Sequence, residues 1–388
     1  MKLSSGIWSR EIVAGLVTAL ALVPEVISFS VISGVSPEIS LFSSVILCLT
    51  LSFAGGRPAM VTAAAGSVAL VAGPMVHTHG LAYLMPAVLL CGALQLIFSC
   101  AGFAGIIRFI KQPVMNGFVN ALGVLIFAAQ LSSVNHHGII IYILFALAAI
   151  ITVCVPRLLP RVPAPLITVL IISLLVYFAG LTVPMVGVQG TELKGDMIRD
   201  WNMAPVNFHT LMIIFPTALS MALVGLMETL LTATVADAMT QTSSDKTRES
   251  LALGAANLLA GSLGGVAGCA MIGQSIVNIE LGKARTRLST FAAGITLLLL
   301  STDMNNILNR IPMVALAGIM AVVAMKTINW NSIRPATLIK SPWSETLIMI
   351  VSVGITVFTG NLAAGVACGV ILTYILIFRK ATTIPTLR

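Results

Sequence analysis

Two glutamates stand in the middle of strongly apolar stretches of the sequence. Glu25 lies in ALVPEVISF, and Glu228 lies in ALVGLMETLLTATVAD. No basic residue lies near the centre of any apolar stretch long enough to cross a membrane. An ionised carboxylate at such a depth is costly, so each must be protonated, bound to a cation or exposed to water. The two residues therefore favour a proton or a metal cation as their partner.

A threonine shares a helix face with the second glutamate. Thr232 follows Glu228 by four residues, which is about one helical turn. A carboxylate, a hydroxyl and backbone carbonyls together form a set of hard oxygens that suits Na⁺. We therefore expect Glu228 and Thr232 to form a coupling site for Na⁺ or H⁺, with no other cofactor. Glu25 is a further candidate for the same cation-coupling role. The alternative is a structural carboxyl group that is hydrogen-bonded between helices.

The elements that position these residues must be membrane helices. Residues of the AVILMFWYC set make up 58% of the 388 residues, charged residues make up 9%, and the mean hydropathy is +1.04. This composition excludes a soluble enzyme, a disordered chain and a nucleic-acid-binding domain. It predicts an all-α membrane protein, whose net charge of +8 is expected from basic cytoplasmic loops. The six cysteines include no C-x-x-C pair, so we interpret them as packing residues.

Hydropathy predicts fourteen membrane segments, two of which are too short to cross alone. The predicted segments are about 12–33, 40–55, 64–76, 82–102, 114–131, 138–155, 163–182, 210–233, 249–263, 271–280, 287–300, 312–326, 345–360 and 362–378. With both termini in the cytoplasm, every basic residue except Lys194, Arg199 and Arg310 falls on the cytoplasmic side. This distribution predicts a multi-pass protein of the plasma (inner) membrane. We expect the histidines to lie in outside loops or at a helix mouth: His77, His79, His136, His137 and His209.

The chain contains an internal repeat. A Gly-Gly pair, Gly55-Gly56 or Gly264-Gly265, precedes a short apolar stretch in each half and follows a helix with a central glutamate. An odd number of segments separates the paired elements, so the two halves must have opposite orientations. We therefore predict a 7+7 inverted repeat within a single membrane domain over residues 1–388. Its parts are a first repeat over 1–182, an extracellular connection over 183–208 and a second repeat over 209–388.

The short stretches of the two halves are candidate half-helices. In inverted-repeat transporters such helices point their N-termini, with free N–H groups and a positive dipole, toward an anionic substrate. Close packing of small residues is the alternative explanation. Phe29 lies one helical turn beyond Glu25. It can line the substrate pocket beside Glu25, or it can be a packing or lipid-facing aromatic residue. The predicted substrate-binding residues are Glu25, Phe29, Ala65, Gly66, Ser67, Gly273, Gln274 and Ser275.

Four segments resemble the sulfate permease (SulP) family of anion transporters. They are GLVTALALVPEVISFSVISGVSP, GGRPAMVTAAAGSVALV, LVGLMETLLTATVADAMT and SDKTRESLALGAANLLAGSLGGVAGCAMIGQSIVNI, which resemble family helices 1, 3, 8 and 9 into 10. The resemblance implies a core and a gate domain, with an anion site between helices 1, 3, 8 and 10. It places Glu25 and Phe29 at that site. It also matches Glu228 to an acid associated with a Na⁺ site in bicarbonate-type members, and Thr232 to a ligand position there.

The chain departs from the family pattern at three places. Gln274 stands where many members have an arginine, which removes a fixed positive charge, and Ala267 replaces the usual proline after the Gly-Gly pair. The cytoplasmic STAS domain of most members is expected to be absent here, naturally or by truncation. Contacts made through that domain, including those of a homodimer, are left open.

These observations predict a secondary active transporter and not an enzyme. The expected partners are the lipid bilayer and a small inorganic or carboxylate anion, with bicarbonate and sulfate as leading candidates, moved by alternating access. One rival is a nucleobase–proton symporter on the same fold, which would carry an acid where Gln274 stands. A passive anion channel is a second rival, which the repulsive carboxylates disfavour. A membrane-embedded enzyme is remote, because no His/Asp, Ser/Lys or Cys/His pairing stands in the predicted segments.

Overall fold

The computed structural model is almost entirely helical. It describes residues 5–106, 111–135, 138–159, 162–186, 203–205, 207–302 and 310–382. The long helices are α1 (Ser5–Ser33), α2 (Pro37–Ala54), α3 (Gly66–His79), α4 (Leu84–Cys100), α6 (Gln112–Val134), α7 (Gly138–Leu158), α8 (Ala164–Phe178), α10 (Phe208–Thr240), α11 (Lys246–Ser262), α13 (Arg287–Thr302), α15 (Met313–Thr327), α18 (Trp343–Thr359) and α19 (Leu362–Thr382). The short elements are β1 (Thr62–Ala63), η1 (Leu81–Tyr83), α5 (Phe103–Ile106), β2 (Cys269–Ala270), α12 (Ile272–Ile276), the π-helical turn η4 (Val277–Leu281), α16 (Trp330–Ile333) and α17 (Pro335–Lys340).

Each predicted membrane segment coincides with a described helix. By length and composition alone, six of the described helices can cross a membrane, and several others are apolar but shorter. The number of crossings and the inverted repeat therefore stay predictions. The loop prediction for His77 and His79 is wrong, because α3 continues past Pro74 and ends at Gly80, whose φ is +92°. His136, His137 and most of the 183–208 connection lie outside the described residues.

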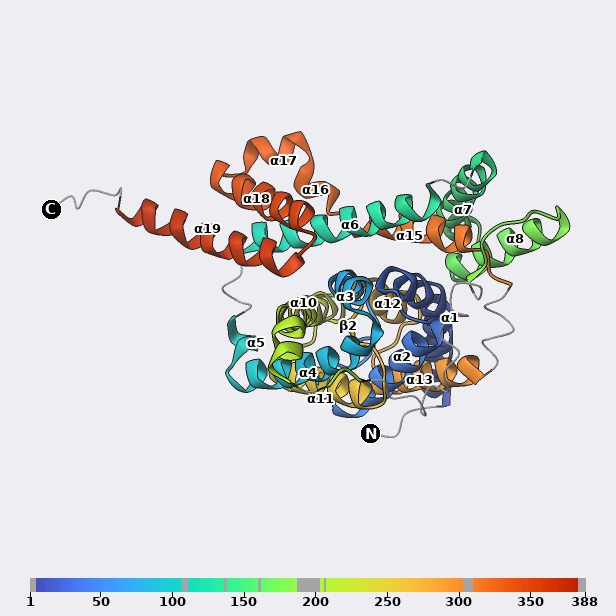
Figure 1. Cartoon of the computed structure of the whole chain (residues 1–388), viewed down its shortest axis with the longest axis horizontal. Coiled ribbons are helices and arrows are strands. Elements are labelled where there is room, and N and C mark those ends of the chain that lie inside the picture. The colour runs from blue at the N-terminus through green and yellow to red at the C-terminus, as the bar shows by residue number, and fades with distance from the viewer. Residues whose placement is uncertain are drawn as a thin grey trace.

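The helices form two layers (Figure 1). The half-helix bundle consists of α1–α4 and α10–α13, in which α4 packs on α11 and α13 packs on α1 and α2. The flanking layer consists of α6–α8 and α15–α19, in which α6 packs on α15 and α18 while α7 packs on α8 and α15. The two layers touch where α1 meets α8 and α15, where α10 meets α19, and where α3 meets α6. Each layer draws helices from both halves of the sequence.

Two short extended segments cross in the middle of the half-helix bundle. β1 and β2 pair antiparallel, with Thr62 opposite Ala270 and Ala63 opposite Cys269. Each strand leads directly into a short helix, β1 into α3 and β2 into α12. At Gly268 the backbone passes so close that a Cβ atom would lie 2.2 Å from the Ala63 carbonyl oxygen, so only glycine fits there. This crossing sets the two short helices on opposite sides of one point.

Side chains of the surrounding helices satisfy the N–H groups that the two-residue strands leave unpaired. The Ser44 hydroxyl accepts from the Ala64 N–H at 3.1 Å, Thr229 from the Ala270 N–H at 3.0 Å, and Ser275 from the Val61 N–H at 3.0 Å. An unpaired backbone group in an apolar interior is costly, so irregular backbone persists there only when it is paired. The hydroxyls of α2, α10 and α12 therefore hold the crossing in place.

Asn257 of α11 anchors the chain that enters β2. Its amide oxygen accepts from the Gly268 N–H at 2.8 Å, and its amide nitrogen donates to the Gly268 carbonyl at 3.0 Å and to Gln95 Oε1 at 2.8 Å. Asn257 and Gln95 are both fully buried. One side chain thus pairs both backbone groups of the glycine at the crossing and ties them to α4.

A charged network at one end of the bundle fixes the Gly55-Gly56 turn. The Glu249 carboxylate accepts from the backbone N–H groups of Gly56 at 2.5 Å and Arg57 at 2.8 Å. The Arg57 side chain in turn pairs with Asp237 at 3.3 Å. These contacts join the start of α11 and the end of α10 to the loop that leads into β1, so they fix the direction in which α3 begins.

Replacing Asn257 with alanine should destabilise the bundle strongly. The change leaves the Gly268 N–H and carbonyl buried without partners, at a cost of about 2–4 kcal/mol. We expect the midpoint of thermal unfolding in detergent to fall by several degrees. Asn331→Ala is the matched control, because Asn331 is exposed on α16. Equal midpoints for the two variants would contradict the anchoring role of Asn257.

Candidate functional site

Glu228 lies at the crossing, beside the start of α3. Its Oε2 accepts a hydrogen bond from the hydroxyl of Ser67, the second residue of α3, and another from the thiol of Cys269 in β2 at 3.1 Å. Only 7% of Glu228 is exposed. The start of α3 has no side-chain cap. A group at this position can therefore interact with the acid and with the free N–H groups of the helix.

Thr232 lies near Glu228 but turns its hydroxyl toward backbone oxygens. It donates to the Glu228 main-chain carbonyl at 2.7 Å and lies 3.4 Å from the Ala270 carbonyl. The predicted shared helix face is therefore present, and carbonyl oxygens stand beside it. The carboxylate itself is bound by Ser67 and Cys269, not by Thr232.

Glu25 lies beside the start of the second short helix. Its Oε1 accepts from the Gln274 side-chain amide at 2.7 Å, and 7% of the residue is exposed. The start of α12 also lacks a side-chain cap. Oε1 of Gln274 is buried and has no hydrogen-bond partner among the described residues. The Glu25–Gln274 pair thus presents an acid and a free acceptor at one place.

A cavity of about 480 Å³ opens beside Glu25, between the half-helix bundle and the flanking layer. Glu25, Gly273 and Gln274 line it from the bundle, and Lys326 and Thr327 line it from α15. A Cβ atom on Gly273 would meet nothing within 4 Å, so the backbone faces open space there. This cavity gives three of the predicted substrate-binding residues a common solvent-accessible wall.

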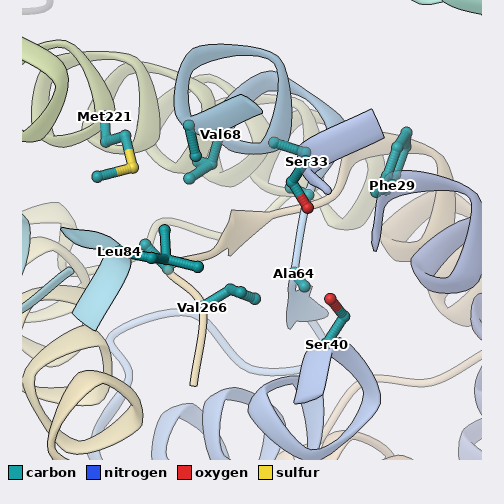
Figure 2. Close-up of a pocket in the computed structure, with 12 residues that line it drawn as sticks. Phe29, Ser33, Ser40, Ala64, Val68, Leu84, Met221 and Val266 are labelled. Carbon is teal, nitrogen blue, oxygen red and sulfur yellow. The ribbon is translucent and has the colours of Figure 1, made fainter. Parts of the chain in front are cut away.

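Phe29 and Ala65 line a second, smaller cavity (Figure 2). In that view Phe29 lies on the opposite side from Met221 and Leu84. The Phe29 ring packs against Gly66, where a Cβ atom would lie 2.4 Å from the ring. Glycine at the first position of α3 therefore lets the aromatic ring close over the start of that helix.

The structure brings most of the predicted residues into two clusters, and each cluster joins residues from both halves of the sequence. Glu25 of the first half contacts Gln274 of the second half, and Glu228 of the second half contacts Ser67 of the first. Ser275 is buried and its hydroxyl accepts from the Val61 N–H, so it holds the crossing together.

Two residues near the site have roles that the sequence reasoning missed. Cys269, interpreted as a packing residue, donates its thiol hydrogen to Glu228. Its position just before a predicted half-helix is the signal that could have found it. Lys326 of α15 lines the same cavity as Glu25. No pattern in the sequence links Lys326 to Glu25, because the two residues lie on different layers.

The arrangement is suited to binding ions of opposite sign. Among the described residues neither Glu25 nor Glu228 has a salt-bridge partner, and no group of three His, Cys, Asp or Glu side chains could hold a metal ion. Each acid lies beside the uncapped start of a short helix, which favours negative charge. A negative ligand and a positive ion can therefore occupy adjacent places, each offsetting the charge that would repel the other.

The fold and the site define a class of membrane transporter in which two short helices meet end to end inside a bundle. The solved transmembrane domain of the cyanobacterial bicarbonate transporter BicA has the same fold. The TM-score is 0.82 at 21% identity, covering 94% of this chain and 98% of that one. The inward-facing structure of the murine anion transporter Slc26a9 superposes with a TM-score of 0.83 at 16% identity, covering 98% of this chain and 70% of that one.

The sequence comparisons agree with this class. The sequence model of the sulfate permease family matches residues 9–139 and 136–352. "Putative sulfate transporter YbaR" of Bacillus subtilis (strain 168) is 40% identical over 374 residues, which cover 96% of this chain and 77% of YbaR. The chain belongs to the sulfate permease family. This membership confirms the predicted resemblance and the prediction that the chain is a transporter and not an enzyme.

Proposed function

We propose that this chain is a secondary active transporter that moves a small anion, sulfate or bicarbonate, together with Na⁺ or H⁺. One observation carries the proposal: each of two buried acids lies beside the uncapped start of a short helix in the same bundle. The helix starts attract an anion, while the acids repel it until a cation neutralises them.

This charge arrangement makes the two ligands bind together. A cation or proton at Glu228 removes the negative charge beside the start of α3, so the anion binds more tightly. By thermodynamic linkage, the bound anion raises the affinity for the cation by the same factor. Simultaneous binding of both is the property that a symporter needs. A passive channel would gain nothing from carboxylates that repel its permeant anion.

Movement of the half-helix bundle against the flanking layer would provide alternating access. In this proposal the bundle is the core domain, the flanking layer is the gate domain, and the 1–182 and 209–388 repeats contribute to both. The 480 Å³ cavity lies between the domains and reaches Lys326 and the start of α8. We propose that the protein lies in the inner membrane with both termini in the cytoplasm. In that orientation the end of the cavity at Lys326 faces the cytoplasm.

The choice of substrate rests on relatives and on the polar groups of the cavity. YbaR is named for sulfate and BicA for bicarbonate. The unpaired Gln274 Oε1 is an acceptor that the hydroxyl of bicarbonate can use, and fully ionised sulfate has no such donor. A nucleobase symporter would carry an acid at this place. We therefore propose both sulfate and bicarbonate as candidate substrates. The proposal is also compatible with a homodimer.

Glu228→Gln should remove the cation dependence of uptake. The amide keeps the size of the side chain, but it cannot take up a proton and has no negative charge to attract a metal cation. Uptake of labelled sulfate and bicarbonate into proteoliposomes, under separate Na⁺ and H⁺ gradients, should lose about tenfold or more of its stimulation by the driving gradient. Glu280→Gln is the matched control, since Glu280 is exposed.

Two outcomes contradict the role of Glu228. One is a Glu228→Gln variant whose uptake stays as steep in both gradients as that of the unmodified protein. The other is a Glu280→Gln variant with the same loss. Thermal unfolding in detergent distinguishes loss of coupling from loss of fold.

Lys326 supplies the positive charge that many family members carry where Gln274 stands. It is the basic side chain that lines the cavity among the described residues, and it lies on the domain opposite to that of Glu25. A cation on the cavity wall raises the local concentration of an anion and orients its entry. Because Lys326 belongs to the gate domain, its attraction acts across the gap that closes during transport.

Lys326→Gln should raise the KM for anion uptake from the cavity side about three- to tenfold, with a weaker dependence on ionic strength. Adding Gln274→Arg should restore the lower KM, because it places a charge in the same cavity. Lys340→Gln, at an exposed position of α17, is the control. An unchanged KM in Lys326→Gln would contradict the role of Lys326, and failure of Gln274→Arg to lower the KM would contradict the shared site.

A further inference from the structure

Another large cavity, of about 660 Å³, is lined by Pro24 and by other residues of α1 but not by either acid. It is formed by α1 and α13 of the bundle and by α8 and α15 of the flanking layer. Apolar side chains make up most of its wall, among them Val169, Leu300 and Leu316. Neither Glu25 nor Glu228 lines it. Small hydrated anions would lose their water there without replacement, so this cavity is not part of the proposed transport site.

The few polar groups on the wall of this cavity lack partners among the described residues. Arg310 lines it two residues before Pro312, the N-cap of α15, and therefore at a helix end. Among the described residues no carboxylate pairs with Arg310. The Ser173 hydroxyl is buried with no partner in the described part of the chain. Pro24 has no N–H, so the Leu20 carbonyl on the same wall lacks its usual helical hydrogen bond.

We propose that this groove binds a phospholipid of the surrounding membrane, with one acyl chain along the apolar wall and the phosphate at Arg310. The two chemistries of the groove match the two ends of one lipid molecule. Each buried CH₂ group of the chain adds to binding. A guanidinium at a helix end pairs with phosphate through two parallel hydrogen bonds. Because Arg310 has no anionic partner in the described chain, an anionic headgroup such as phosphatidylglycerol is favoured over a zwitterionic one.

The bound lipid would bridge the two layers. α1 and α13 belong to the half-helix bundle, and α8 and α15 belong to the flanking layer, so a chain in the groove touches both. Any displacement of one layer against the other changes the shape of this groove. The lipid is therefore placed where it favours the arrangement seen here over one in which the groove closes.

Native mass spectrometry of the purified protein tests this inference. The protein is prepared in a mild detergent with equal amounts of phosphatidylglycerol and phosphatidylethanolamine. The unmodified protein should retain more phosphatidylglycerol than phosphatidylethanolamine. Arg310→Gln should retain about tenfold less, because it loses charge-assisted hydrogen bonds to the phosphate, while Arg310→Lys should retain most of it. Arg334→Gln, which removes an exposed arginine elsewhere, should behave as the unmodified protein does.

A second variant tests the acyl-chain half of the groove. Leu170 lines the cavity and is 54% exposed, so Leu170→Trp can fill the groove without disturbing the interior. It should lower lipid retention although Arg310 is intact. Equal retention by Arg310→Gln and the unmodified protein would overturn the inference, as would an equal loss in Arg334→Gln. Lipid retention by Leu170→Trp equal to that of the unmodified protein would also overturn it. So would the finding that the bound molecule is a compound without phosphate.

Discussion

The antiparallel pairing of β1 and β2 is the contact on which the rest of the structure depends. Two residues from each half of the sequence meet there, inside a bundle that offers no water to their backbone groups. Ser44, Thr229, Asn257 and Ser275 bind N–H groups around this crossing. These polar side chains are buried in a chain that is otherwise strongly apolar. They are best explained as the partners that make an interrupted pair of helices tolerable.

The crossing also determines where charge can be placed. It sets α3 and α12 start to start, so each uncapped helix end faces a region that the acid from the other half of the sequence can reach. Glu25 therefore meets Gln274, and Glu228 meets Ser67. A fixed arginine at position 274 would neutralise part of this charge permanently. With glutamine there, the positive charge nearby is that of Lys326 on the opposite layer. The proposed coupling requires that an ion that comes and goes complete the neutralisation.

Much of the fold followed from the sequence, because its signals are local. Apolar runs identified the helices, and the two Gly-Gly pairs located the short helices within a few residues. The contacts that Glu25 and Glu228 make with the opposite half of the sequence were not predictable, since they depend on how the halves pack. The same holds for Lys326, which lines the cavity of Glu25 from another layer, and for Cys269, whose thiol is distinguished from that of a packing cysteine by its hydrogen bond to Glu228. The hydroxyl of Thr232 faces backbone carbonyls, a detail that helical spacing alone does not decide.

The most direct test of the account measures anion affinity at equilibrium. Sulfate and bicarbonate are titrated into the purified protein in a calorimeter, over a range of Na⁺ concentrations at fixed pH and over a range of pH without Na⁺. We predict that the Kd of one anion falls by about five- to 150-fold as the concentration of the coupling cation increases, and that the Kd of the cation falls by the same factor when the anion is present. An anion Kd that is the same at every Na⁺ concentration and every pH would contradict it.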